Sequence, residues 1–108
     1  MVLKAFFVGC LLITLTSSNA SAQAERDDAA MAEYLGLLDQ IAPPAREGAE
    51  AFMAAFRRKC GRDLRSSELR RAVADGNGNP VLMQMMRAKH DRNESELARL
   101  AGLVECRP

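Results

Sequence analysis

Apolar residues recur at helical spacing along most of the chain after residue 22. Over residues 25–41, Met31, Tyr34, Leu35 and Leu38 repeat at i, i+3, i+4 and i+7. This spacing places side chains on one face of a helix. Acidic residues crowd the first turn of the segment, where they suit the positive end of the helix dipole. The pattern therefore predicts an amphipathic first helix over residues 25–41.

Proline and glycine divide the next part of the chain into two further predicted helices. Pro43 and Pro44 end the first helix and can start the second, because proline is tolerated in a first turn. One apolar stripe marks the second helix, namely Ala49, Phe52, Met53, Phe56 and Cys60. We expect this helix to stop at Gly61. Ser66 or Ser67 is then expected to cap a short third helix that runs to about residue 74.

The segment Asp-Gly-Asn-Gly-Asn-Pro at residues 75–80 is the strongest break in the chain, because each of its residues favours turns. Over residues 81–105 one stripe holds Leu82, Met86, Leu97, Leu100 and Val104, although two polar residues interrupt it. This segment is either one long helix or two helices that meet near Asp91, with Asn93 and Glu96 as a capping pair. We favour the continuous helix. Strand patterns are missing after residue 22, so the predicted fold is an all-α bundle of four helices, or five.

The first 22 residues are built differently from the rest. A short basic start, residues 1–4, precedes an apolar run over residues 5–16, and the small-residue pattern Ala20-Ser21-Ala22 follows. This is the order of a secretory signal peptide. A membrane anchor would need about 20 apolar residues to cross the hydrocarbon. We expect cleavage after Ala22, or after Ala24, which leaves residues 23–108 as a single exported domain in the periplasm or outside the cell, with no membrane span.

Charge and cysteine content change with this cleavage. The full chain has 15 Lys plus Arg and 14 Asp plus Glu, and removing Lys4 leaves 14 of each. A neutral domain is not expected to bind nucleic acid. Only Cys60 and Cys106 remain after processing, and an exported domain of this size predicts a disulfide between them. Two buried free thiols are the alternative.

The clearest local charge excess is in residues 57–71, which hold two acids, Asp63 and Glu68, and seven cations. The cations are Arg57, Arg58, Lys59, Arg62, Arg65, Arg70 and Arg71. Arginine pairs bidentately with carboxylate and phosphate groups. We therefore expect a small binding protein whose partner is a protein or another anionic surface in the envelope or outside the cell. The alternative is a solvated helix end whose cations complement the helix dipole.

Methionines and a histidine form a second unusual cluster. Met83, Met86 and His90 fall on one side of a helix, and thioethers with an imidazole suit Cu(I). Methionine also fills core gaps, so packing is the competing interpretation. A periplasmic Cu(I)-binding protein is thus one alternative function, and an envelope stress chaperone of the holdase type, with a methionine-rich surface, is another.

No catalytic constellation is visible in the sequence. His90 is the only histidine, and its neighbour Asp91 would point to a different side of a helix. A nucleophile motif of the form G-x-S-x-G is missing, and the predicted disulfide consumes both remaining cysteines. The sequence therefore predicts a protein that is not an enzyme and that uses no cofactor.

Overall fold

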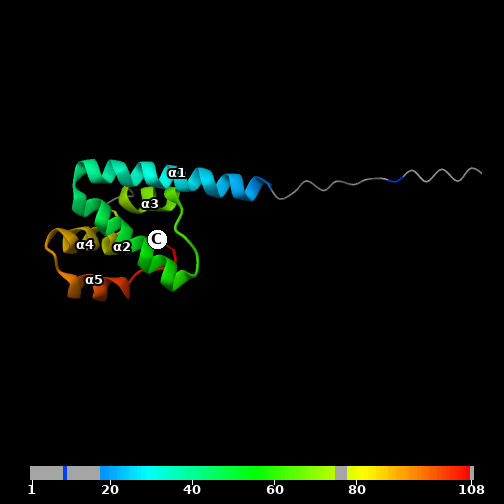
Figure 1. The fold of residues 1–108 in the computed structure, drawn as a ribbon. Coiled ribbons are helices and arrows are strands. Elements are labelled where there is room, and N and C mark those ends of the chain that lie inside the picture. Colours follow the sequence, from blue (N-terminus) through cyan, green and yellow to red (C-terminus); the bar gives the residue numbers. More distant parts are fainter. Residues whose placement is uncertain (1–8, 10–17, 75–77, 108) are drawn as a thin grey trace, which may run out of the picture.

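A computed structural model describes residues 9, 18–74 and 78–107. It contains five helices over these residues: α1 (Ser18–Ile41), α2 (Pro43–Cys60), α3 (Ser66–Ala74), α4 (Pro80–His90) and α5 (Glu94–Ala101). No strand occurs in the described ranges, so the predicted all-α bundle is confirmed (Figure 1). Most of the predicted signal peptide, and residues 75–77 of the predicted turn, lie outside the described residues.

Helix α1 begins earlier than the predicted start at Glu25 and continues through the expected cleavage site after Ala22. Residues 19–26 are exposed, and Asp27, which follows them, is partly buried. From there Met31, Leu35 and Leu38 are buried, at the positions that the apolar spacing predicts. The contribution of α1 to the core therefore starts at about residue 27.

Helix α2 is central to the bundle and is in contact with α1, α4 and α5 (Figure 1). Its aromatic residues Phe52 and Phe56 are fully buried, in line with the predicted stripe. The other large, fully buried side chains come from the following segments and are Leu69, Leu82, Met85, Leu100 and Val104. Gly61 ends α2 as predicted, with a φ of 71° and an N–H that donates to the Arg57 carbonyl.

The close approach of α2 to α4 depends on Gly48, which is buried. A Cβ at this position would lie 2.5 Å from Cα and 2.6 Å from the backbone nitrogen of Met86. These are backbone atoms, so a side chain cannot move aside to make room. Glycine therefore sets the spacing between the two helices, at the cost of about 1 kcal/mol of helix propensity.

Helix α3 begins differently from the predicted serine cap. Ser66 lies inside the helix, and its hydroxyl donates to Asp27 Oδ1 of α1 at 2.7 Å. The local capping role falls to Glu68, whose carboxylate accepts the N–H of Arg65 at 3.1 Å. A residue of α1 thus binds the start of α3, which ties together two segments that are far apart in the sequence.

The prediction of one continuous helix over residues 81–105 is wrong. Helix α4 ends at His90, and Arg92 adopts a φ of 54°. The N–H of Arg92 donates to the Lys89 carbonyl and that of Asn93 to the Ala88 carbonyl, which is the Schellman pattern of helix ends. The Asn93 side chain then accepts the Glu96 N–H at 3.1 Å and caps α5. The alternative of two helices with this capping pair is therefore the correct one.

The predicted disulfide between Cys60 and Cys106 is present, with a Cα–Cα distance of 5.6 Å. It joins the end of α2 to the irregular segment that follows α5. Closing a loop of 46 residues stabilises a domain by about 4 kcal/mol in the chain-entropy model. The buried side chain of Val104 and a hydrogen bond of 2.7 Å from Lys59 Nζ to the Gly102 carbonyl hold the same segment against the bundle.

Candidate functional site

The basic segment, residues 57–71, runs from the last turn of α2 through the connecting loop into α3. All seven of its cationic residues are exposed. Arg57, Arg58 and Lys59 lie in the last turn of α2, where positive charge complements the helix dipole. These three charges therefore stabilise the end of α2. The contacts of each side chain show which of the seven cations are also available to bind a partner.

Two cations at the end of α2 contact neighbouring groups of the fold. Arg57 Nε lies 3.5 Å from Asp63 Oδ1, and both side chains are more than 70% exposed. An ion pair with this exposure contributes little to stability. Lys59 instead donates to a backbone carbonyl near the disulfide. Arg57 can thus exchange its partner at little energetic cost, whereas Lys59 helps to hold the C-terminal segment.

Arg62 is the most constrained cation of the basic segment. Its guanidinium binds the Glu68 carboxylate through two hydrogen bonds of 2.8 and 2.9 Å. It also lies over the ring of Phe56, 4.8 Å from the centroid. The hydrogen bonds from Arg62 lower the pKa of Glu68, and the same pair raises the pKa of Arg62. This pair therefore neutralises one cation and one anion within the fold.

Arg70 is a second cation of the basic segment that contacts an aromatic ring of the fold. Its guanidinium lies 5.2 Å from the ring centroid of Tyr34 in α1. Burial raises the pKa of the Tyr34 hydroxyl, and the nearby positive charge of Arg70 partly offsets that rise. Arg70 therefore links α3 to α1, and the same cation–π contact fixes part of its side chain.

A shallow hollow of about 230 Å³ lies beside the disulfide. Its charged side chains come from the basic segment and from the C-terminal segment. It is lined by Arg62, Glu68, Arg71, Cys106 and Arg107. The disulfide brings Arg107 to this place, and sequence reasoning missed it as a site residue. The pairing of Cys60 with Cys106 was the available signal, because any residue next to Cys106 must lie near the end of α2. With Glu68 bound to Arg62, Arg71 and Arg107 leave the hollow positive.

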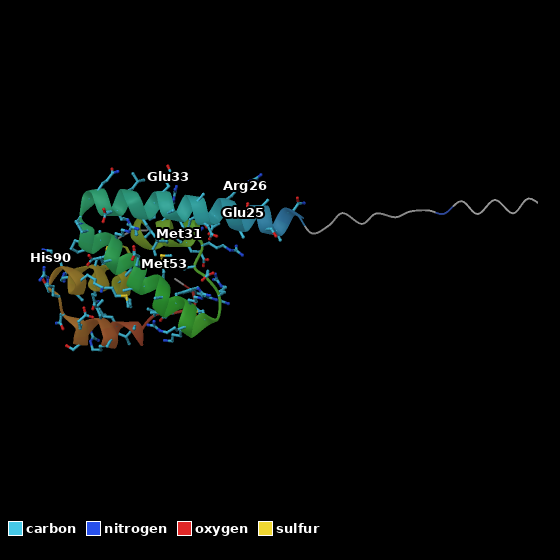
Figure 2. The ribbon with its side chains drawn as sticks, viewed as in Figure 1. Glu25, Arg26, Met31, Glu33, Met53 and His90 are labelled. Carbon is cyan, nitrogen blue, oxygen red and sulfur yellow. A yellow bond between two sulfur atoms is a disulfide. The ribbon has the colours of Figure 1, made fainter. Side chains whose placement is uncertain are left out.

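The residues of the predicted Cu(I) cluster have different surroundings. The side chain of Met83 lies against Gly78, where an added Cβ would be 3.2 Å from its sulfur. Met86 packs against Gly48 of α2. The imidazole of His90 is exposed and lies 3.1 Å from Asp91 Oδ1 through Nδ1 (Figure 2). Both methionines are partly buried against the core, which is the packing role that competes with metal binding.

Other classes of site find no support in the described part of the chain. Its side chains include no group of three His, Cys, Asp or Glu residues arranged to hold a metal ion. Of its helices, none combines the length and apolar character needed to cross a membrane. Comparisons of the chain with models of protein families, with curated proteins and with solved structures found no match. The charge of the basic segment is therefore the strongest chemical feature from which to infer a function.

Proposed function

We propose that this chain is a small exported binding protein whose basic surface docks on an acidic protein surface. The basic surface consists of exposed cations of the last turn of α2, the following loop, α3 and the C-terminal segment, namely Arg57, Arg58, Arg65, Arg71 and Arg107. Of these, Arg71 and Arg107 line the hollow beside the disulfide. The observation that carries the proposal is the positive hollow beside the disulfide, where Arg71 and Arg107 converge while Glu68 is already bound. Guanidinium groups in this setting suit bidentate pairing with carboxylates.

Acids interspersed among these cations favour a protein partner over a dense polyanion. Asp63 lies beside Arg57, and Glu68 lines the hollow. A nucleic acid would bring closely spaced phosphates against both carboxylates, whereas a protein can place its own acids and bases to match a mixed surface. The near-neutral charge of the whole chain agrees with this preference.

Export is part of the proposal and rests on the N-terminal sequence pattern and on the disulfide. Disulfides persist in oxidising compartments, so the Cys60–Cys106 bond fits a periplasmic or secreted domain. Residues 19–26 are exposed, so none of the residues with described burial that cleavage after Ala22 would remove belongs to the core. The intact mass of the protein from its native host tests this. A mass that starts at Gln23 or Glu25, and that is two hydrogens lighter before reduction, would support export, and a full-length chain with free thiols would contradict it.

Binding can be tested with fluorescently labelled poly-L-glutamate as the acidic probe. We expect the protein to bind it in low salt and to release it as the ionic strength rises. Replacing Arg65 and Arg71 by glutamate should weaken this binding by about tenfold or more. Arg62 and Arg70 are left unchanged, because their contacts with Glu68 and Tyr34 would confuse lost binding with lost stability.

The matched control is Arg87→Glu, which makes the same charge change at an exposed position of α4 outside the basic surface. The double variant should lose far more affinity than this control. Equal losses in both proteins, or no binding by the unaltered protein, would refute the proposal. Vesicles of phosphatidylglycerol and phosphatidylcholine form the second arm, and binding to them alone would contradict a protein partner.

A further inference from the structure

One stripe of α1 is exposed although it carries large apolar side chains. Leu37 is 48% exposed and Ile41 is 78% exposed. Together with Glu33 they repeat every four residues, so the three side chains lie within about 80° of one another around the helix. Figure 2 shows Glu33 on the side of α1 that faces away from the bundle. We call these three residues the α1 stripe, and no part of the chain that the structure describes covers its two apolar side chains.

A groove of about 380 Å³ lies between α2, α4 and α5. Its apolar lining consists of four alanines of α2 and α5 and of two larger side chains, namely Ala51, Ala54, Ala98, Ala101, Met85 and Leu97. Its charged lining residues are Arg58, Lys89 and one acid, Glu94. The ion pairs found among the described residues do not involve Arg58, Lys89 or Glu94. The groove therefore has a mostly apolar lining with two cations and one acid.

The stripe and the groove match each other in chemistry and in length. Branched side chains at Leu37 and Ile41 fit a lining that is mostly apolar, and the Glu33 carboxylate complements Arg58 and Lys89. The stripe extends over about 12 Å at 1.5 Å per residue. The groove follows α2 from Ala51 to Arg58, which is about 10 Å by the same measure.

A single molecule cannot bring the two together. Helix α1 lies along one edge of the bundle and α5 along the opposite edge, with α2 between them (Figure 1). We therefore propose that the α1 stripe of one copy docks in the groove of a second copy, so that the protein self-associates through these two surfaces. This contact goes beyond the proposed binding of an acidic partner and uses different surfaces apart from Arg58. A reciprocal arrangement would close a dimer with two identical contacts.

Sedimentation equilibrium of the purified, oxidised protein over a range of concentrations measures this association. We expect the average mass to rise with concentration from that of one chain toward that of two or more. A stripe variant, Leu37→Ser with Ile41→Ser, and a groove variant, Ala54→Glu with Ala98→Glu, should each raise the dissociation constant by at least about tenfold. Leu37, Ile41, Ala54 and Ala98 are exposed, so the folded monomer should tolerate their replacement. Leu103→Ser is the matched control, because Leu103 is 50% exposed and belongs to neither surface.

Mixing the two variants gives the sharpest outcome. The stripe variant keeps an intact groove and the groove variant keeps an intact stripe, so the mixture should associate more tightly than either variant alone. A protein that stays monomeric up to its solubility limit would overturn the proposal. Association that survives both variants, or that is lost equally with Leu103→Ser, would also overturn it. Binding of poly-L-glutamate through Arg65 and Arg71 is measured independently, so either proposal can fail without the other.

Discussion

Asp27 of α1 accepts two hydrogen-bond donors from Ser66, the first residue of α3. The Ser66 hydroxyl lies 2.7 Å from Asp27 Oδ1, and the Ser66 backbone N–H lies 3.2 Å from the same oxygen. The first N–H groups of a helix lack partners within it, so this carboxylate acts as a helix cap supplied by another helix. The contact joins residues 39 positions apart and fixes where α3 meets α1.

Replacing Asp27 by alanine is expected to destabilise the domain by about 1–2 kcal/mol, because a charge-assisted cap is lost and a partly buried N–H loses its partner. The measurement is the free energy of unfolding in urea. Asp28→Ala provides the control, since Asp28 is its exposed neighbour on the same helix. If Asp27→Ala and Asp28→Ala unfold at the same urea concentration, the cap makes no contribution to stability.

Gly48 and Gly36 should respond oppositely to alanine. At Gly48 an added Cβ would meet backbone atoms of Met86 at 2.5 and 2.6 Å, so α2 and α4 would have to separate. We expect Gly48→Ala to cost about 2 kcal/mol or more despite its better helix propensity. At Gly36 in α1 an added Cβ meets nothing within 4 Å, and Gly36→Ala should stabilise by about 0.5–1 kcal/mol.

Urea unfolding of both variants measures these changes. A destabilised Gly36→Ala protein would show that α1 is not helical at this position. A Gly48→Ala protein as stable as the unaltered one would contradict the close packing of α2 on α4. Shortening the Met86 side chain should not rescue Gly48→Ala, because the nearest atoms belong to the backbone.

The stability of the domain should fall in acid partly through Glu68. Hydrogen bonds from Arg62 lower the pKa of Glu68 in the folded protein below its ordinary value of 4.5. A carboxylate with a lowered folded pKa contributes stability above its unfolded pKa and loses that contribution as the pH falls through the folded value. The contribution of Glu68 to the free energy of unfolding should therefore be constant near neutral pH. It should decrease once the pH is lower than about 4.5.

Glu68→Gln is the variant that isolates this effect. It should be less stable than the unaltered protein at pH 7, and the two should converge as the pH decreases below 4.5. Glu105→Gln, at an exposed position, should follow the unaltered protein throughout. A constant difference between Glu68→Gln and the unaltered protein across this range would mean that the Arg62–Glu68 pair does not couple stability to pH.

Periodicity and composition were sufficient to predict much of the fold. Met31, Leu35, Leu38, Phe52 and Phe56 are buried where the apolar stripes place them. The stop at Gly61 and the disulfide follow from local rules about glycine and about cysteines in exported domains. These features were predictable because each depends on a residue's neighbours in the chain or on a count of its type.

Relationships between distant segments were not predictable. The Asp27–Ser66 cap and the need for glycine at position 48 both depend on how helices cross. The contacts of Arg62 and Arg70 with aromatic rings likewise required three-dimensional packing. For this reason the sequence located the basic segment but could not separate its structural cations from those available to a partner.

The break between α4 and α5 was misjudged because apolar spacing continues on both sides of it. Lys89 and Asn93 occupy two successive positions of that stripe, and the chain turns between them. Helices often end on a glycine in the left-handed region, whereas here the residue is Arg92, with a φ of 54°. The usual sequence signal of a helix end was therefore missing, and only the Asn93 cap remained.

Arg92→Gly should accordingly stabilise the protein. The left-handed conformation strains a residue with a Cβ, and glycine adopts it without that cost. The hydrogen bonds of the Schellman pattern come from backbone groups and are kept. We expect a gain of up to about 1 kcal/mol in the free energy of unfolding, partly reduced by the greater freedom of glycine in the unfolded chain. Arg87→Gly, inside α4, is the contrasting variant and should lose about 1 kcal/mol. A loss of stability in Arg92→Gly would show that α4 and α5 do not meet through this turn.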